Sequence, residues 1–413
     1  MYNGCHSNLA RASEVKFRVG RVVKLLVVVS SLDLAQPYSA TPAWWQLLKG
    51  LYELGVDIIA TPYQGMPVES LWWRCEDNPA RWQGEAFRSM RGFVRRWRRA
   101  NPGEAVGESL SDRAVRGAAR AFIAPVWRRH LEGILKRNPD IDALLFLTVP
   151  LNHLVGVPRY LSQKYDLPVF YFDGDVPASL PNMQGFASGF RIYQGADVKE
   201  YTAFISNSTG GEALLRQLGV ERVHTVWYGA DPEVFSRAPV AAQDIDVLFY
   251  GHGREYRSEW IDQMISAPSR QLTDARFAVR GNNLGDIGDC EALPYLSFSK
   301  LREYVCRSKL NLCITRDAHA NVACSSSSRP FELAAMSACV VANPYLGLET
   351  WFEPEKEIII VSSGEEAIER YRFLLGHDSA RESIGRAARE RVLKQHTFRH
   401  RARELLAIVR QYM

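Results

Sequence analysis

Short apolar runs alternate with stretches of helical periodicity along most of the chain. The first run, Lys24–Ser30, is apolar at nearly every position, as expected for a strand of a parallel sheet that is buried on both faces. A helical pattern then opens at Thr41 and ends at Gly55. A second strand follows at Val56–Thr61. This strand–helix–strand order predicts a parallel α/β sheet.

The same order recurs towards the end of the chain. Further strands are predicted at Ile141–Thr148, Pro168–Phe172, Ala203–Asn207, Arg222–Trp227, Asp246–Tyr250, Ala275–Val279, Leu310–Ile314, Val340–Val341 and Glu357–Val361. Helical patterns separate most of them, and the long one at Ser111–Lys136 should bend at Pro125, because proline removes a backbone N–H donor. The predicted fold class is α/β, with doubly wound, Rossmann-like sheets.

The chain is long enough for two domains. Its 413 residues are 46% hydrophobic, which allows two buried cores. Ser236–Gln243 is polar and contains Pro239, as an interdomain linker should, so we place the boundary near residue 240. An N-terminal domain over residues 21–240 and a C-terminal domain over residues 241–395 are expected. Residues 1–20 show no periodicity, which predicts a mobile tail.

Composition and charge narrow the class of protein. A net charge of +5 suits an anionic small ligand, but it is too weak to indicate a nucleic-acid-binding protein. The seven cysteines show no paired metal spacing and are interpreted as reduced thiols, which indicates a cytoplasmic location. The apolar run Val22–Leu32 would suit a signal peptide, but Lys24 interrupts it and no small-residue cleavage site follows, so a buried strand is favoured.

The stretch Ser325–Val341 carries the most specific candidate site; it reads SSSSRPFELAAMSACVV. Pro330 suits the first turn of a helix, which Ser328 or Arg329 would cap. A helix start binds anions through its free N–H groups and dipole, and the Arg329 guanidinium is suited to a phosphate. Glu332 can accept two hydrogen bonds from a vicinal diol such as a ribose. These groups suit a nucleoside diphosphate, although serines and a glutamate at a helix start also act as ordinary caps.

A second phosphate-binding pattern directly follows the predicted strand Asp246–Tyr250. Gly251 and Gly253 would let the backbone approach a phosphate closely. Arg254 and Arg257 would neutralise its charge. The pattern is shorter than a full dinucleotide-binding motif, so it gains weight from the neighbouring site rather than by itself.

The C-terminal part of the chain resembles a known family of enzymes. Arg329–Glu332 followed by a small-residue helix, then Asn343–Phe352 and Arg391–Leu406, look like the spore maturation protein B-like (CgeB-type) glycosyltransferases, which are similar to glycosyltransferase family 4. The resemblance covers roughly Asp244–Met413. It implies the GT-B fold, in which two Rossmann-like domains face each other across a cleft and the last helix, here within residues 396–413, crosses back to the N-terminal domain.

The resemblance also implies an activity and a set of site residues. Such enzymes move a sugar, here expected to be a hexose, from a nucleoside diphosphate sugar to an acceptor, and they need no metal or other cofactor. In the family, the turn that carries Tyr295 contacts the nucleotide base, with a core aromatic ring as the alternative. The residues expected to bind the nucleotide sugar are Gly251, Gly253, Arg257, Tyr295, Ser327, Ser328, Pro330, Phe331 and Glu332. Arg254 and Arg329 are the expected catalytic cations, because fixed positive charge must stabilise the departing diphosphate.

Polar side chains at predicted strand ends supply candidates in the N-terminal domain. His153 is the expected catalytic side chain, with a histidine bonded to its own loop as the alternative. Asp33, Asp173 and Asp175 are assigned to the acceptor side. The spacing of the last two also suits a divalent metal, but we favour a loop or acceptor role. An inverting enzyme would need a base here and a retaining enzyme would not; the resemblance favours retention.

Other interpretations stay open. The basic face Arg88–Arg99 of an amphipathic helix would be solvated, or would contact anionic lipid headgroups at a membrane or a polyanionic acceptor. Cys324 stands where the family has its first acid, eight positions before Glu332, which leaves room for a nucleotide-sugar-binding protein without turnover. A nucleotide-sugar epimerase is another alternative, and modification of a nucleic acid is the least favoured.

Overall fold

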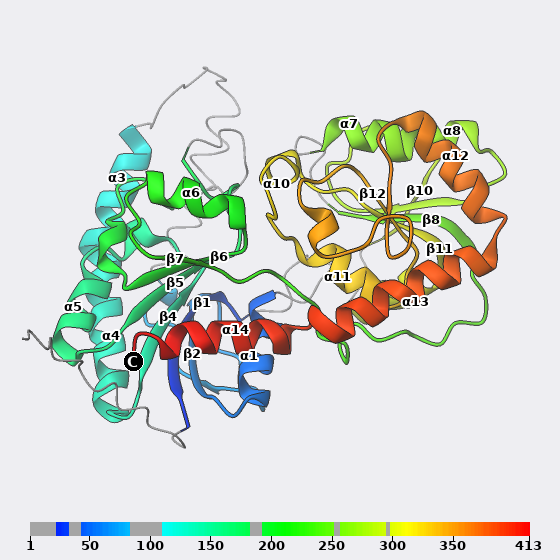
Figure 1. Cartoon of the computed structure of the whole chain (residues 1–413). Coiled ribbons are helices and arrows are strands. Elements are labelled where there is room, and N and C mark those ends of the chain that lie inside the picture. Colours follow the sequence, from blue (N-terminus) through cyan, green and yellow to red (C-terminus); the bar gives the residue numbers. More distant parts are fainter. Residues whose placement is uncertain (1–21, 33–42, 83–109, 182–191, 252–256, 295–297) are drawn as a thin grey trace, which may run out of the picture.

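The computed structural model describes residues 22–32, 43–82, 110–181, 192–251, 257–294 and 298–413. Figure 1 shows two lobes, each formed by a sheet with helices packed around it. Every pair of neighbouring strands in the two sheets is parallel. The predicted α/β fold with two Rossmann-like sheets is therefore confirmed.

The N-terminal sheet has seven described strands in the order β3-β2-β1-β4-β5-β6-β7. At its centre, Leu26 of β1 pairs with Ile59 of β2 and Leu144 of β4. The continuous apolar run of β1 is buried on both faces, as its pattern predicts. The strand bounds are β1 Lys24–Ser31, β2 Asp57–Gln64, β3 Arg74–Cys75, β4 Ala143–Leu147, β5 Val169–Asp173, β6 Ala203–Ser206 and β7 Val223–Thr225.

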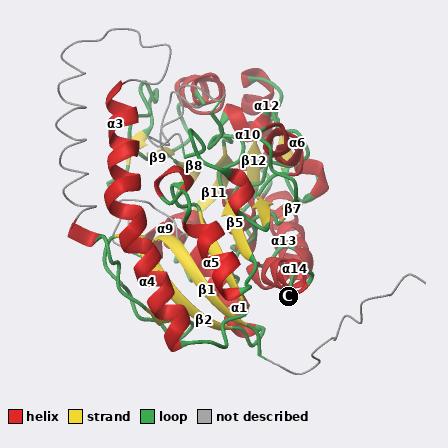
Figure 2. Ribbon diagram, turned by 90° about the vertical axis from the view of Figure 1, so that its left-hand side faces the viewer, coloured by secondary structure: helices red, strands yellow, loops and turns green. Residues whose placement is uncertain are grey.

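Helices cover both faces of this sheet. Figure 2 shows α4 and α5 lying across one face, where Trp127 and Leu131 of α4 pack in the same core cluster as Phe146 of β4. The helical segments of this domain are α1 Ala43–Glu53, α3 Leu110–Ala118, η1 Ala119–Ile123, α4 Ala124–Arg137, η2 Leu151–His153, α5 Val157–Tyr165, η3 Val198–Glu200 and α6 Thr209–Gln217.

The C-terminal sheet has six described strands in the order β10-β9-β8-β11-β12-β13. The strands are β8 Ile245–Tyr250, β9 Phe277–Arg280, β10 Glu291–Ala292, β11 Ser308–Cys313, β12 Val340–Ala342 and β13 Ile359–Ile360. The helical segments are α7 Ser258–Ile261, η5 Asp262–Ser266, α8 Ala267–Gln271, α9 Phe298–Arg307, α10 Asp317–Ala320, α11 Ser328–Ala335, η6 Leu348–Thr350, α12 Gly364–Leu375 and α13 Asp378–Gln395.

The last helix, α14 (Phe398–Arg410), returns to the N-terminal domain and packs against α1 (Figure 1). Thr397 begins it with a capping box, in which His400 supplies the second hydrogen bond. Phe398, Leu405 and Val409 are buried in the core cluster that also contains the β1 side chains. The predicted crossing of the C-terminal helix back to the N-terminal domain is confirmed.

Two π-helical turns precede prolines. The segment η1 lies directly before α4, whose second residue is Pro125, and η5 lies directly before α8, whose second residue is Pro268. A proline ring clashes with the carbonyl group four residues earlier and cannot donate the helical hydrogen bond, and a wider turn accommodates both effects. The bend that the sequence predicts at Pro125 thus coincides with a π turn.

Candidate active site

The two domains meet where the segment after β6 runs beside the loop before α11. Ser208 and Ser325 form an antiparallel bridge between them. The Asn207 side-chain amide donates to the Ser326 carbonyl oxygen at 2.8 Å, and the Ser326 hydroxyl donates to the Asn207 carbonyl oxygen at 2.8 Å. The first serines of the stretch that we singled out in the sequence therefore hold the domains together.

A chain of polar groups crosses the same contact. Arg316, which follows β11, forms an ion pair with Asp175, just beyond β5, and its guanidinium lies 2.7 Å from His319 Nε2. His319 Nε2 also lies 3.2 Å from the Asp175 carboxylate, and His319 Nδ1 lies 2.8 Å from Ser325 Oγ. The Ser325 hydroxyl in turn donates to the Val176 carbonyl oxygen at 2.7 Å.

These partners keep Asp175 ionised. Burial would raise the pKa of Asp175, but the Arg316 guanidinium and His319 outweigh that effect and lower the pKa to about 2. Burial lowers the pKa of His319, so its imidazole is neutral near pH 7. Asp175 is consequently a poor proton acceptor at neutral pH, although its side chain keeps 31% of its exposure.

Three arginines gather at the carboxyl ends of β8 and β11. Burial, together with the positive charges of Arg316 and Arg329, lowers the pKa of Arg257 to about 10. Arg257 donates to the Ile314 carbonyl oxygen at 3.1 Å, and the Arg329 guanidinium stacks on the Tyr250 ring with 3.5 Å between its Cζ and the ring centroid. Guanidinium groups gathered in this way form a site for a multiply charged anion.

Glu332 lies beside this cluster, and its neighbours compensate only in part for its burial. It is 1% exposed, and neither carboxylate oxygen has a hydrogen-bond partner among the described residues. Burial raises the pKa of Glu332 to about 7, while Arg329, Ser328 and Gln46 of α1 oppose the rise. The buried Nε of Arg329 likewise has no partner within the described part of the chain. Buried polar atoms without partners cost free energy unless a ligand supplies the bonds.

The N-terminus of α11 is not capped by the side chain of its N-cap residue. Its N-cap is Ser327, one residue before the predicted cap, and the Ser327 side chain makes no hydrogen bond to the helix. Pro330 and Phe331 are buried, and the Phe331 ring packs against Trp351 and Phe352 in the core beneath the helix. Pro330 and Phe331 therefore belong to the core beneath the site. Ser327 and Ser328 lie at the helix start and are half-buried.

Gly251 directly follows β8, where a side chain would be crowded by the Phe249 ring. A Cβ atom there would lie 2.7 Å from the Phe249 ring. The Gly251 amide donates to the Arg280 carbonyl oxygen at 2.9 Å, so it is already part of the sheet.

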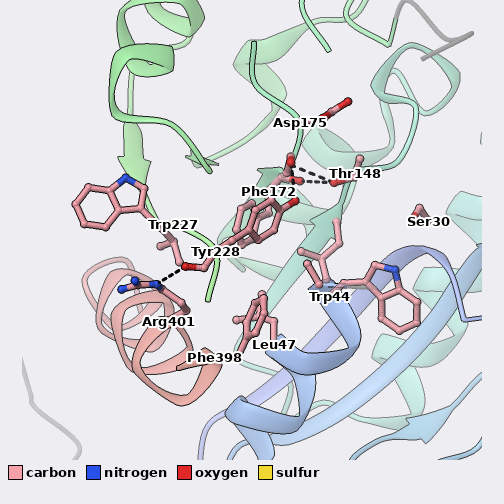
Figure 3. A pocket seen from close by; sticks show the side chains of 14 residues that line it. Ser30, Trp44, Leu47, Thr148, Phe172, Asp175, Trp227, Tyr228, Phe398 and Arg401 are labelled. Atoms are coloured by element: carbon pink, nitrogen blue, oxygen red, sulfur yellow. Dashed lines mark hydrogen bonds between the residues drawn. The ribbon is translucent and has the colours of Figure 1, made fainter. Parts of the chain in front are cut away.

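A cavity of about 280 Å³ opens at the carboxyl end of the N-terminal sheet (Figure 3). Side chains from α1, the strand ends of β1, β4 and β5, and α14 line it. Asp175 lies at its edge, so the cavity adjoins the interdomain contact. Its hydrocarbon and aromatic lining residues are Ala43, Trp44, Leu47, Leu147, Phe172, Val226, Trp227, Tyr228 and Phe398.

Asp173 and His153 do not line this cavity. Asp173 is fully buried and accepts hydrogen bonds from the Ser179 hydroxyl at 2.5 Å and the Tyr193 hydroxyl at 2.6 Å. Burial raises the pKa of Asp173 to about 6. His153 is 7% exposed, and its Nδ1 lies 2.7 Å from the Tyr63 hydroxyl. A catalytic role for His153 stays a prediction.

Some predicted residues fall outside the described part of the chain. They are Asp33, the basic stretch Arg88–Arg99, Gly253, Arg254 and Tyr295. Within the described part, no group of three or more histidine, cysteine, aspartate or glutamate side chains is arranged to share a metal ion. The six cysteines described are free thiols, and no described helix has the length and apolarity to cross a bilayer.

Sequence reasoning missed Arg316 and His319. Both follow β11, in a segment between two predicted elements to which we assigned no site residue. A charged residue immediately beyond a buried strand end was the available signal, because ligands collect at the carboxyl ends of parallel strands.

The comparisons with known proteins agree with this geometry. Residues 254–407 match the family model described as glycosyl transferase-like, which lies within the region of the predicted resemblance. The whole architecture matches sucrose-phosphate synthase from Thermosynechococcus elongatus, with a TM-score of 0.62 and 13% identity over 94% of this chain and 98% of that chain. The chain has the GT-B fold.

Two other solved structures have the same architecture. The trehalose-6-phosphate synthase OtsA matches with a TM-score of 0.63 and 12% identity over 94% of this chain and 99% of that chain. HepE from Anabaena, solved in complex with UDP, matches with a TM-score of 0.59 and 12% identity over 94% of this chain and 100% of that chain. No curated protein sequence gives a significant match.

Proposed function

We propose that the protein transfers a sugar, of the hexose type, from a nucleoside diphosphate sugar to an acceptor. One observation carries this proposal: Arg257, Arg316 and Arg329 gather at the carboxyl end of the C-terminal sheet beside the buried carboxylate of Glu332, which lacks a partner among the described residues. The cations suit a diphosphate, and the carboxylate suits the two hydroxyls of a ribose. The match of residues 254–407 to a glycosyl transferase-like family supports the same assignment.

The donor would lie with its diphosphate against the arginines and its ribose against Glu332. Each hydrogen bond to a charged group contributes roughly 1.5–3 kcal/mol, and the fold itself holds the positive charge in place. We take UDP as the first nucleotide to test, because the matched structure of Anabaena HepE contains it.

We propose retention of configuration and no requirement for a metal. In that reaction the bond between the anomeric carbon and the phosphate oxygen breaks, the acceptor oxygen bonds to the same carbon, and the acceptor proton passes to the departing phosphate. The three arginines would stabilise that phosphate. Asp175, the acid at the edge of the N-terminal cavity, is held ionised by Arg316 and His319, which argues against a side-chain base at this position.

The nearest kinship that we propose is with the CgeB-type glycosyltransferases. The segments that carry it, Arg329–Glu332, Asn343–Phe352 and Arg391–Leu406, lie within or overlap the matched region 254–407. The departure at Cys324 stands beside Gly347, whose φ is +92° and whose added Cβ would lie 2.5 Å from the Cys324 sulfur. The sulfur thus fills the space beside a tight turn.

Thermal unfolding against a panel of nucleotides and nucleotide sugars tests the donor site. A ligand that binds only the folded state raises the melting temperature. We expect UDP or another nucleoside diphosphate to raise it in the parent and not in Glu332→Ala, with no effect of a chelator. A parent chain that responds to no nucleoside diphosphate would overturn the proposal.

The reaction itself needs a second measurement. Release of the nucleoside diphosphate from the best-binding sugar nucleotide, in the presence of candidate acceptors, reports transfer. Conversion of the free sugar nucleotide without acceptor would indicate an epimerase instead. Tight nucleotide binding with neither reaction would indicate a binding protein.

A further inference from the structure

The cavity in the N-terminal domain has a mostly apolar lining, although it lies at the ligand-binding edge of the sheet. It lies where β1, β4 and β5 end, beside the contact with the C-terminal domain, and nine of its lining side chains are hydrocarbon or aromatic. Figure 3 shows Leu47 of α1 and Phe398 of α14 forming its floor below Tyr228 and Phe172. Carboxyl ends of parallel strands are where ligands bind in open α/β sheets.

The polar groups on the cavity wall are largely engaged with one another. The Thr148 hydroxyl accepts from the Gly174 amide at 3.2 Å, and the Tyr228 hydroxyl donates to the Gly174 carbonyl oxygen at 2.5 Å. Arg401 donates from Nε to the Tyr228 carbonyl oxygen at 3.0 Å and from Nη1 to Glu404 at 2.8 Å. Among the described lining residues, few groups are left to receive the hydroxyls of a bare sugar, and a polar group buried without a partner costs roughly 1–3 kcal/mol.

The size of the cavity and its position fit a part of a small molecule. A volume of about 280 Å³ is close to the lower end of the range for small-molecule pockets, roughly 300–1,000 Å³. Apolar cavities of this kind bind apolar ligands readily, because no ordered water has to be displaced from polar partners. Asp175 at the rim links the cavity to Arg316, and so to the proposed donor site.

We propose that this cavity is the acceptor subsite and that it binds an aromatic or hydrocarbon group of a hydroxyl-bearing acceptor. The inference rests on the proposed function, since it names the class of acceptor for the same reaction. The acceptor hydroxyl lies towards Asp175 and the C-terminal domain, and the apolar group lies against Leu47, Phe172 and Phe398. A free sugar is excluded as the acceptor.

Three glucosides with the same polar part test the proposal. Methyl, phenyl and octyl β-glucoside are titrated into the full chain by calorimetry, the last below its micelle concentration. We expect phenyl or octyl β-glucoside to bind at least tenfold more tightly than methyl β-glucoside. Tighter binding of the phenyl compound identifies an aromatic group, and tighter binding of the octyl compound identifies a hydrocarbon chain. Equal affinities for all three, or no binding by any, would overturn the proposal.

Variants place the binding in the cavity. Ser30 lines the cavity and is only half-buried, so Ser30→Phe fills the space with little strain on the core and should weaken the apolar glucoside at least tenfold. Trp44→Ala, which removes one wall, serves the same purpose if Ser30→Phe does not fold. Trp82→Ala, at a position that is 78% exposed and outside the cavity, is the matched control and should bind like the parent. Unchanged binding in both cavity variants would show that the site lies elsewhere.

The donor site is followed separately in the same proteins. UDP should raise the melting temperature of Ser30→Phe as much as that of the parent, because Ser30 belongs to β1, whereas Arg257, Arg329 and Glu332 belong to the C-terminal domain. Loss of glucoside binding with an intact UDP response supports the acceptor subsite. An absent UDP response in the parent contradicts the proposed function, whatever the glucosides do.

Discussion

At the scale of single residues, the candidate site is defined by groups that lack protein partners. Glu332 is buried beside Arg329, yet its oxygens have no hydrogen-bond partner among the described residues. A carboxylate in this position is costly in the empty protein and favourable when a diol donates to it. This destabilising effect comes from one side chain, so replacing Glu332 should change the free energy of unfolding measurably.

Glu332→Gln should change how stability depends on pH. Burial raises the pKa of Glu332 from its ordinary value of 4.5 to about 7. Between these pH values the folded state holds more protons than the unfolded state, so parent stability should fall as pH rises and level off above pH 7. Relative to the parent, Glu332→Gln should gain up to about 3 kcal/mol between pH 4.5 and pH 8. Urea unfolding at both pH values checks this, with the exposed Glu390→Gln as control.

Arg329→Gln should weaken the binding of a diphosphate more than that of a nucleoside. The loss of one charge-assisted contact, roughly 1.5–3 kcal/mol, corresponds to about a 10- to 100-fold loss in UDP affinity. Uridine, which has no phosphate, should bind the variant and the parent alike. Calorimetry with both ligands measures the difference. Arg270→Gln removes an exposed arginine that pairs with Asp286, and it should leave both affinities unchanged. Equal losses for UDP and uridine would count against a phosphate contact at Arg329.

The sequence predicts the chemistry of this site better than it predicts which residues the site contacts. Arg329 and Glu332 are recognisable in the sequence, because an arginine at a helix start suits a phosphate and a glutamate there suits a ribose. The contact of Ser326 with Asn207 joins residues 119 positions apart, and the ion pair of Arg316 with Asp175 joins residues 141 positions apart. No local pattern encodes such pairs, which is why the serine run appears in the sequence as a ligand loop and is used in part as a domain contact.

At the scale of elements, close packing of α14 on α1 depends on Gly50. A Cβ atom at Gly50 would lie 2.8 Å from the Phe398 carbonyl oxygen. Backbone cannot yield cheaply, so the two helices would have to move apart.

Gly50→Ala should therefore destabilise the protein, although alanine is the better helix former. We expect a loss of about 1–3 kcal/mol in the free energy of unfolding. Gly133→Ala in α4 is the matched control, since the nearest atom to its new Cβ would be the Arg137 side chain at 3.5 Å. The control should gain about 0.5–1 kcal/mol from helix propensity. Chemical unfolding of both variants decides the matter; a gain in Gly50→Ala would contradict the close approach.

The longer elements follow from periodicity, and the shortest do not. The strands β1 and β8 are found within one residue of their predicted limits, because continuous apolar runs mark strands buried on both faces. The edge strands β3 and β10 have two residues each, too few for any period. The π turns before Pro125 and Pro268 were not predicted as such, since the proline signal predicts a break without its geometry.

At the scale of the whole molecule, the relative position of the domains depends on the contact between residues 207–210 and 323–326. The Gly210 amide donates to the Ala323 carbonyl oxygen at 2.8 Å. A Cβ atom at Gly210 would lie 2.9 Å from the Ala323 amide nitrogen. This contact brings Asp175 to Arg316 and His319.

Gly210→Leu should open the molecule without unfolding either domain. The added side chain would collide with backbone at Ala323, so the radius of gyration from small-angle scattering should increase and transfer activity should fall at least tenfold. Far-ultraviolet circular dichroism should stay unchanged. Gly117→Leu, at a position with no neighbour of its added Cβ within 4 Å, is the control for leucine on an exposed helix. An unchanged scattering curve together with full activity would show that this contact does not set the domain arrangement.

The return of α14 to the first lobe has a consequence during synthesis. Leu405 and Val409 bury themselves against side chains of β1, a strand that leaves the ribosome hundreds of residues earlier. Until Phe398–Arg410 emerges, the nascent N-terminal lobe exposes the apolar surface that this helix will cover, and exposed apolar surface invites aggregation or chaperone binding. Completion of the first lobe thus waits for translation of the second, which couples the maturation of the two halves in time.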